Sequence, residues 1–152
     1  MKQIQWFPGH MTKALRMLEV EVKLADVIYY VLDARAPFSC VNPELNKIAG
    51  NKPFIYILNK ADMADDNVTT KWKNYFTKAN TKAIVLNSTK SNASQILIKE
   101  TLKTLSEKLD KYKQKGINKP LRAMIVGVPN SGKSTLTTNL CGKAKAITGN
   151  KP

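Results

Sequence analysis

Residues 121–134 read Leu-Arg-Ala-Met-Ile-Val-Gly-Val-Pro-Asn-Ser-Gly-Lys-Ser, and from Gly127 onward they fit the pattern G-x-x-x-x-G-K-[ST]. The apolar stretch 121–126 predicts a strand, and a helix is expected from about Lys133, which is the context that a phosphate-binding loop requires. In such a loop the backbone N–H groups and the helix N-terminus point at phosphates. We expect Lys133 to contact the outer phosphates of a nucleotide and the Ser134 hydroxyl to bind Mg²⁺.

Apolar strands alternate with amphipathic helices along the rest of the chain. Residues 27–32, 54–58 and 83–86 are apolar without alternation, as strands covered on both faces are. Helices are expected from His10 to about Leu24, after Asn42-Pro43, around Trp72, and over a long segment whose apolar face carries Ile98, Leu102, Leu105, Leu109 and Tyr112. This order predicts an α/β fold with a doubly wound parallel sheet. Ligands of such sheets bind at the carboxyl ends of the strands.

The sequence Asn59-Lys60-Ala61-Asp62 follows the strand expected at 54–58 and fits the guanine-reading pattern N-K-x-D. Guanine offers two adjacent donors, N1–H and the N2 amino group, and the two oxygens of the Asp62 carboxylate match both of them. Adenine lacks that pair of donors, so Asp62 is expected to discriminate against it. The Lys60 stem is expected to lie flat over the base, and Asn59 to connect the base-binding loop to the phosphate loop.

A second polar turn, Asn87-Ser88-Thr89-Lys90, follows the strand expected at 83–86. Short polar turns after strands are common, so this turn is informative only because it comes after the N-K-x-D box. We expect its backbone N–H groups, including that of Thr89, to bind guanine O6, and Asn87 or Ser88 to brace the loop. The predicted base-binding residues are therefore Asn59, Lys60, Asp62, Asn87, Ser88 and Thr89.

The order of the two motifs is unusual, because the base-reading box at 59–62 precedes the phosphate loop at 127–134. In an ordinary GTPase the phosphate loop comes first. Both motifs are needed to hold one GTP, so this order indicates a circular permutation, in which the fold has been cut and rejoined elsewhere.

Asp33 supports a competing interpretation. Residues 27–33 form an apolar strand that ends in Asp33, which is similar to the Mg²⁺-binding Walker B element of a P-loop ATPase. This interpretation is disfavoured because the N-K-x-D box would have no function in an ATPase. The alternative is that Asp33 and Arg35 fix the loop after the strand.

His10 is the only histidine of the chain, and it lies in the segment Trp6-Phe7-Pro8-Gly9-His10. A lone histidine at a helix start is usually structural or exposed. Its pKa range also suits the activation of a water molecule, so a catalytic role stays open.

The composition is that of a soluble globular domain, with 43% hydrophobic and 24% charged residues among 152. No apolar run approaches 18 residues, and the N-terminus does not read as a secretory signal, so we expect a cytoplasmic protein without a transmembrane segment. Cys40 and Cys141 are interpreted as reduced thiols. The net charge of +14 favours a polyanionic partner such as a nucleic acid or a ribonucleoprotein, although codon bias produces the same Lys- and Asn-rich pattern.

Taken together, the motifs closely resemble those of the circularly permuted GTPases of the ribosome biogenesis GTPase A family. The resemblance runs from Gln5 to Pro152, and it rests on Trp-Phe-Pro-Gly-His-Met at 6–11, Asp-Ala-Arg-Ala-Pro-Phe-Ser at 33–39 with Asn42-Pro43, the N-K-A-D box and the phosphate loop. It implies that the protein binds GTP or GDP and hydrolyses GTP slowly while assisting the assembly of the large ribosomal subunit. The implied polyanion is ribosomal RNA, not DNA.

The resemblance also implies roles for single residues. Asn59, Lys60 and Asp62 bind the base, Asn87 and Ser88 support it, and the phosphates and Mg²⁺ are held by Asn130, Ser131, Gly132, Lys133, Ser134 and Thr135. Because the family lacks the usual catalytic glutamine, the histidine at position 10 is the candidate that orients the attacking water.

The C-terminal part departs from the family pattern, because no acidic residue follows Asp110 and no D-x-P-G motif follows the phosphate loop. We therefore expect residues 1–152 to be the N-terminal part of a permuted G domain, without the switch strands and the helical C-terminal domain. In this interpretation the strand at 121–126 is left at an exposed edge of the sheet. A non-catalytic guanine-nucleotide-binding module is the alternative from another functional class.

Overall fold

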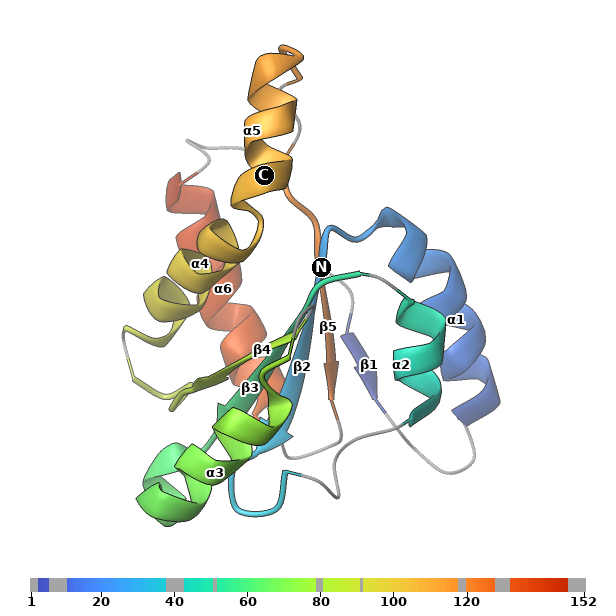
Figure 1. Ribbon diagram of the computed structural model, residues 1–152. Coiled ribbons are helices and arrows are strands. Elements are labelled where there is room, and N and C mark those ends of the chain that lie inside the picture. Colours follow the sequence, from blue (N-terminus) through green and yellow to red (C-terminus); the bar gives the residue numbers. More distant parts are fainter. Residues whose placement is uncertain are drawn as a thin grey trace.

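A five-stranded parallel sheet forms the centre of the computed structural model (Figure 1). The structure describes residues 3–5, 11–37, 43–50, 52–78, 81–90, 92–117, 120–127 and 132–147. The strands are β1 (Gln3–Gln5), β2 (Val27–Asp33), β3 (Phe54–Asn59), β4 (Thr81–Val85) and β5 (Ala123–Gly127), and their order in the sheet is β1-β5-β2-β3-β4. The predicted parallel α/β fold is therefore confirmed.

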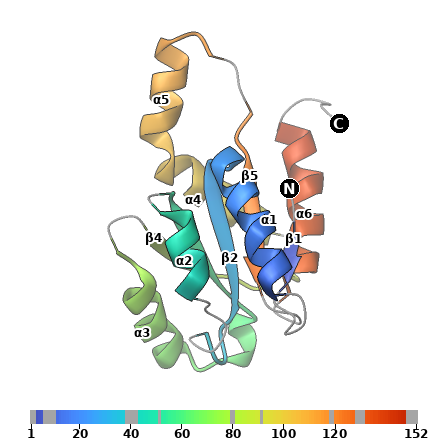
Figure 2. The same ribbon diagram turned by 90° about the vertical axis from the view of Figure 1, so that its right-hand side faces the viewer.

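Helices cover both faces of the sheet (Figure 2). The helices are α1 (Met11–Leu24), α2 (Pro43–Ala49), α3 (Asp66–Phe76), α4 (Ala93–Thr104), α5 (Ser106–Gln114) and α6 (Lys133–Ile147), with a 3-10 turn, η3, at Ala61–Met63. Side chains of α1, α2 and α3 pack on one face of the sheet, and side chains of α4 and α6 pack on the other. Within the described residues, no helix is long and apolar enough to cross a bilayer.

The central strands lie in the middle of the sheet because their side chains are apolar on both faces of the strand. In β2, Ile28, Tyr30 and Leu32 join the core below α1, α2 and α3, whereas Tyr29 and Val31 join the core below α4 and α6. Full burial of each such side chain contributes about 1.5–3 kcal/mol, which is why an uninterrupted apolar run specifies a central strand.

The prediction of a single long helix through Ile98 and Tyr112 is wrong, because the structure has two helices, α4 and α5, which are separated at Leu105. Leu105 is buried to 2% exposure in the core on the α4 side, while Leu102, expected on the same face, is 47% exposed. After the break α5 projects beyond the sheet (Figure 1), and none of its residues is buried. An ion pair between Lys108 and Asp26, 2.5 Å, ties it to the start of β2.

The expected exposure of the phosphate-loop strand is also wrong. β5 lies between β2 and β1, and Gln3, Ile4 and Gln5 pair with Ile125, Val126 and Gly127. The sequence gives no sign of β1, because its three residues are too few and too polar to read as a strand. β1 covers the outer side of β5 from Ile125 to Gly127, and β1 becomes the edge strand of the described sheet.

Several expectations fall on residues outside the described ranges. These are His10 and the segment 6–9 before it, Asn42 at the start of the second expected helix, and the part of the phosphate loop at 128–131. The strands themselves begin and end within two residues of the expected positions. Their carboxyl ends carry Asp33, Asn59 and Gly127, and these three ends build the candidate site.

Candidate nucleotide-binding site

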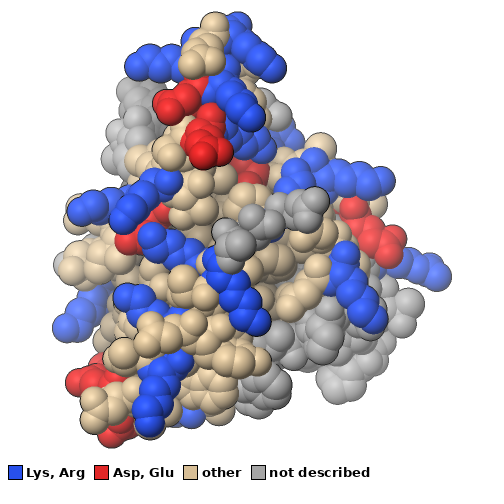
Figure 3. All heavy atoms as spheres, in the orientation of Figure 1, with Lys and Arg blue, Asp and Glu red and all other residues tan. Residues whose placement is uncertain are grey.

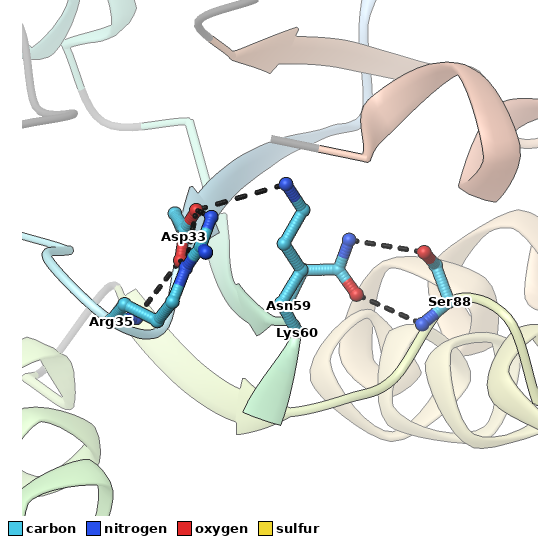
Figure 4. Close-up of polar contacts among 5 residues, drawn as sticks. All are labelled: Asp33, Arg35, Asn59, Lys60 and Ser88. Carbon is cyan, nitrogen blue, oxygen red and sulfur yellow. Dashed lines mark hydrogen bonds and ion pairs between the residues drawn. The ribbon is translucent and has the colours of Figure 1, made fainter. Parts of the chain in front are cut away.

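The Asn59 side chain joins two loops that follow neighbouring strands (Figure 4). Asn59 is the last residue of β3 and is fully buried. Its Nδ2 donates to Ser88 Oγ at 3.0 Å, and its Oδ1 accepts from the Ser88 N–H at 2.9 Å. A buried amide needs such partners, since each unsatisfied polar group costs about 1–3 kcal/mol. Ser88, one of the two residues expected to brace the loop, therefore does so through these bonds.

Gly132 brings the phosphate loop against the same amide. A Cβ atom on Gly132 would overlap Asn59 Nδ2 and would lie 3.3 Å from Ser88 Oγ. The backbone of Gly132 has φ +90°, a conformation that residues with a Cβ rarely adopt. The box at residue 59 and the loop at residue 132 therefore meet in space, as expected from their motifs, although they are far apart in the chain.

The first turn of α6 presents its backbone donors next to this contact. The Leu136 N–H donates to the Gly132 carbonyl at 3.1 Å, so the helix begins immediately after the glycine. The N–H groups of Lys133, Ser134 and Thr135 therefore lie in the first turn, where helices have no internal acceptors for them. Ser134 and Thr135 are exposed, whereas Asn130 and Ser131 lie outside the described residues.

Lys133 is a buried cation at the start of α6. It is only 3% exposed, and its Nζ has no hydrogen-bond partner among the described residues. Burial lowers the pKa of the Lys133 ammonium to about 8. A buried charge without a partner is costly, so this position favours an anion beside it.

Asn139 is a site residue that the sequence motifs did not reveal. It lies on α6, and its Nδ2 donates to the Ser88 carbonyl at 2.7 Å. The helix that begins at the phosphate loop is thereby tied to the loop that braces Asn59. No motif covers position 139, and only the place of Asn139 between the buried Leu136 and Leu140 marks this side of the helix as inward-facing.

A pocket of about 320 Å³ lies between η3 and the turn after β4. Its lining includes the Asp62 and Asp66 carboxylates, Asn87, Lys90 and the apolar Ile96. Asp62 is exposed on this pocket, so its carboxylate is open to a ligand from solvent. Asp62 and Asn87, two of the predicted base-binding residues, thus line one pocket.

The Thr89 N–H, expected to bind guanine O6, has an internal acceptor. It donates to Asn87 Oδ1 at 3.1 Å, and the Thr89 hydroxyl contacts the same oxygen at 2.5 Å. Asn87 therefore braces the turn too, as an Asx turn does. A ligand oxygen at Thr89 N–H has to replace the Asn87 oxygen.

The Asp33 carboxylate is already paired. Arg35 donates to it from Nε at 3.0 Å and from a terminal nitrogen at 2.6 Å, and the Arg35 backbone N–H adds a bond of 2.9 Å (Figure 4). The hydrogen bond from Arg35 is the main cause that lowers the pKa of Asp33. The expectation that Asp33 and Arg35 fix the loop after the strand is confirmed.

Comparison with known proteins gives consistent results. A family model described as 50S ribosome-binding GTPase matches residues 122–152. Ribosome biogenesis GTPase A of Bacillus licheniformis is 45% identical over 98% of this chain and 53% of its own length, and the protein of that name from Thermotoga maritima is 32% identical over 98% and 50%. Mitochondrial ribosome-associated GTPase 1 of Bos taurus is 33% identical over 90% and 41%.

Two solved structures share the fold. GNP-bound YlqF from T. maritima has a TM-score of 0.59 and 33% identity over 86% of this chain and 48% of its own. The GDP-bound structure of TM YlqF has a TM-score of 0.58 and 32% identity over 84% and 48%. The chain is thus similar in sequence to the ribosome biogenesis GTPase A proteins over nearly its whole length. It spans about half the length of the curated relatives that it matches.

Replacing Gly132 by alanine tests the contact between the two motifs. Gly132→Ala should lower the free energy of unfolding by about 2–4 kcal/mol, because the new methyl group meets a buried amide and the backbone is strained. Gly116→Ala is the matched control, since Gly116 also has positive φ, 68°, but open space around its Cβ position. It should lose only about 1 kcal/mol. Urea unfolding measures both, and equal losses would contradict the contact.

Lys133 should titrate near pH 8 in the free protein, against 10.5 for an ordinary lysine. The unfolded chain then binds more protons than the folded one between these values, so folding stability should rise with pH through that window. Carbon NMR of the lysine side chains, with Lys133→Arg for assignment, measures the midpoint. A midpoint near 10.5 would show that the ammonium is solvated.

Proposed function

We propose that this protein binds GTP and GDP and acts as a GTPase that assists assembly of the large ribosomal subunit. The contact of Gly132 with the Asn59 amide carries the proposal, because it unites a phosphate loop and an N-K-x-D box in one site. Relatives named ribosome biogenesis GTPase A support it, and one similar solved structure is the GDP-bound form of YlqF.

In this proposal the base is read beside η3. The Asp62 carboxylate accepts from N1–H and N2 of guanine, and the Lys60 stem lies over the base. Asn59 takes part indirectly, since both ends of its amide are bound to Ser88. Asn87, Ser88 and Thr89 then shape the loop around O6.

The phosphates lie at the start of α6. The first-turn N–H groups of Lys133, Ser134 and Thr135, together with Asn130, Ser131 and Gly132, surround the phosphates, and Lys133 supplies the counter-charge. Supporting this placement, Lys133 is a buried cation that has no carboxylate within ion-pair distance among the described residues.

The donor set fits a Mg²⁺–nucleotide complex. Within the described ranges no group of three His, Cys, Asp or Glu side chains gathers that could hold a metal ion. Mg²⁺ commonly binds through one or two protein oxygens and the phosphates of a substrate, which matches the exposed Ser134 hydroxyl beside Lys133. The ion would neutralise charge on the phosphate oxygens. His10 stays the predicted group for orienting water, and residues 1–152 stay the predicted N-terminal part of a permuted G domain.

Ribosomal RNA is the proposed partner, and the cytoplasm the proposed location. The net charge of +14 supports attraction to RNA. Lysine and arginine side chains are spread over the face shown in Figure 3, with acidic side chains among them. This distribution supports steering toward a large polyanion more than readout by one compact patch.

An ATPase that uses Asp33 as a metal ligand is the weaker alternative. The Asp33 carboxylate is bound through two nitrogens of Arg35 and has the Lys60 ammonium at 3.8 Å, so its charge is compensated before any metal arrives. A non-catalytic guanine-nucleotide module differs from the main proposal only in hydrolysis.

Asp62→Asn should change the base preference of the site from guanine to xanthine. The amide nitrogen donates to the xanthine O2 but faces the guanine amino group as a second donor, so GDP affinity should fall roughly 30- to 100-fold while that for xanthosine diphosphate rises. Competition of both nucleotides, and of ADP, against a fluorescent GDP measures this. Asp66→Asn, which changes another carboxylate of the same pocket, should leave the preference unchanged. Equal competition by ADP and GDP in the wild type would refute selectivity for guanine.

Large ribosomal subunits should stimulate GTP hydrolysis. Phosphate release is measured with and without purified subunits, using the B. licheniformis relative as the positive control. Association should weaken steeply as salt rises from about 50 to 200 mM, because phosphate contacts release counterions. Because residues 1–152 are predicted to lack the switch strands and to hydrolyse GTP weakly, the assay uses the full-length protein. Nucleotide binding by the full-length protein without any stimulation of hydrolysis would favour the non-catalytic module.

A further inference from the structure

The Asp33 carboxylate makes a contact that its role in the loop does not require. Besides the bonds from Arg35, Asp33 Oδ2 lies 3.8 Å from the Lys60 ammonium (Figure 4). The Lys60 side chain is 26% exposed and that of Asp33 is 17% exposed, so both are partly shielded from water. The pair therefore connects the residue that ends β2 to the lysine of the N-K-x-D box.

The backbone forces Lys60 toward β2. Asp33 and Asn59 are register partners at the ends of β2 and β3, and the Ala34 N–H donates to the Asn59 carbonyl at 2.8 Å. Lys60 itself has φ 59° and ψ 35°, and among the described residues it is the one non-glycine residue with positive φ. This left-handed conformation is unfavourable for a residue with a Cβ, and such conformations cluster at functional sites.

The direction of the lysine matters because of the strand order. β2 lies between β3, which carries the base-reading box, and β5, which leads to the phosphate loop. A Lys60 side chain that reaches from the end of β3 to Asp33 at the end of β2 thus extends toward the phosphate loop. Without an anchor, a lysine loses considerable side-chain entropy when it is ordered by a ligand.

We propose that Asp33, oriented by Arg35, is a positioning residue that holds the Lys60 side chain over the nucleotide site before the nucleotide binds. This inference rests on the proposed function, because it concerns the lysine that covers the base. Arg35 has two tasks. Its planar fork fixes the carboxylate, and its charge offsets a carboxylate that would otherwise repel the phosphates.

The test is a double-mutant cycle on nucleotide dissociation. Asp33→Asn should raise the dissociation rate of a fluorescent GDP roughly two- to fivefold, the size expected for a partly shielded charge pair. Lys60→Met keeps an apolar stem and removes the ammonium. In the Lys60→Met background, Asp33→Asn should change the dissociation rate no further, because the group that Asp33 anchors is gone. Stopped-flow displacement measures all four proteins.

Asp65→Asn is the matched control, since it removes a carboxylate that accepts a bond from the Val68 N–H at the start of α3 and has no part in the proposed anchor. It should leave nucleotide dissociation unchanged, and thermal unfolding checks that each variant folds. If Asp33→Asn accelerates dissociation equally with and without the Lys60 ammonium, Asp33 acts through the loop alone and the inference is overturned. If the wild type does not bind GDP at all, the proposed function itself is refuted, and the inference about Asp33 is refuted with it.

Discussion

The site depends on one buried amide. Asn59 is fully buried at the end of β3, where its oxygen accepts from the Ser88 N–H and its nitrogen donates to the Ser88 hydroxyl. The same nitrogen leaves no space for a side chain at position 132. Three loops that follow three different strands thus meet at one group. Separating the loops of Asn59 and Ser88 would leave a buried polar atom unsatisfied, and the Gly132 loop packs directly against the same amide.

This arrangement explains why the motif order can be permuted. The contact between Asn59, Ser88 and Gly132 depends on where strands end in the sheet, and all strands run in the same direction. Parallel strands present their carboxyl ends at one edge whatever their order in the chain. Asn139 strengthens the arrangement from the phosphate side, because α6 is bonded through it to the Ser88 carbonyl. The geometry of the site therefore does not depend on the order in which the motifs occur along the chain.

The sequence predicts those parts of the fold that follow from burial on two faces or from a fixed motif. The strands containing Val31, Ile57 and Ile125 are predicted correctly because each contains at least four consecutive apolar residues. The break at Leu105 was missed, since an apolar repeat continues through Leu109 and only the packing of Leu105 into the core shows the change of direction. β1 was missed because three residues of the pattern Gln-Ile-Gln carry no signal without their partner β5.

The candidate site divides in the same way. Asn59, Gly132 and Lys133 come from motifs whose spacing is fixed by chemistry, and the structure brings them together. Asn139 contributes through a tertiary contact, which no local pattern encodes. The Asx turn of Asn87 has a local signal, but its consequence, an occupied Thr89 N–H, follows only from the observed bond.

Two charged groups at the strand ends, Asp33 and Lys133, differ in whether the protein compensates their charge. This difference indicates which ligand charge the site favours. Asp33 has Arg35 and Lys60 beside it, so its charge is compensated within the protein. Lys133 is more deeply buried, and burial alone lowers its pKa, with no described carboxylate near enough to oppose that effect. A neutral ligand would leave the cost of burying Lys133 in place, whereas a phosphate chain removes it. The same surroundings give no comparable advantage to a cation at Asp33. The electrostatics of the strand ends therefore favour an anion at the start of α6, on the same edge of the sheet as the N-K-x-D loop, whose lysine is paired with Asp33.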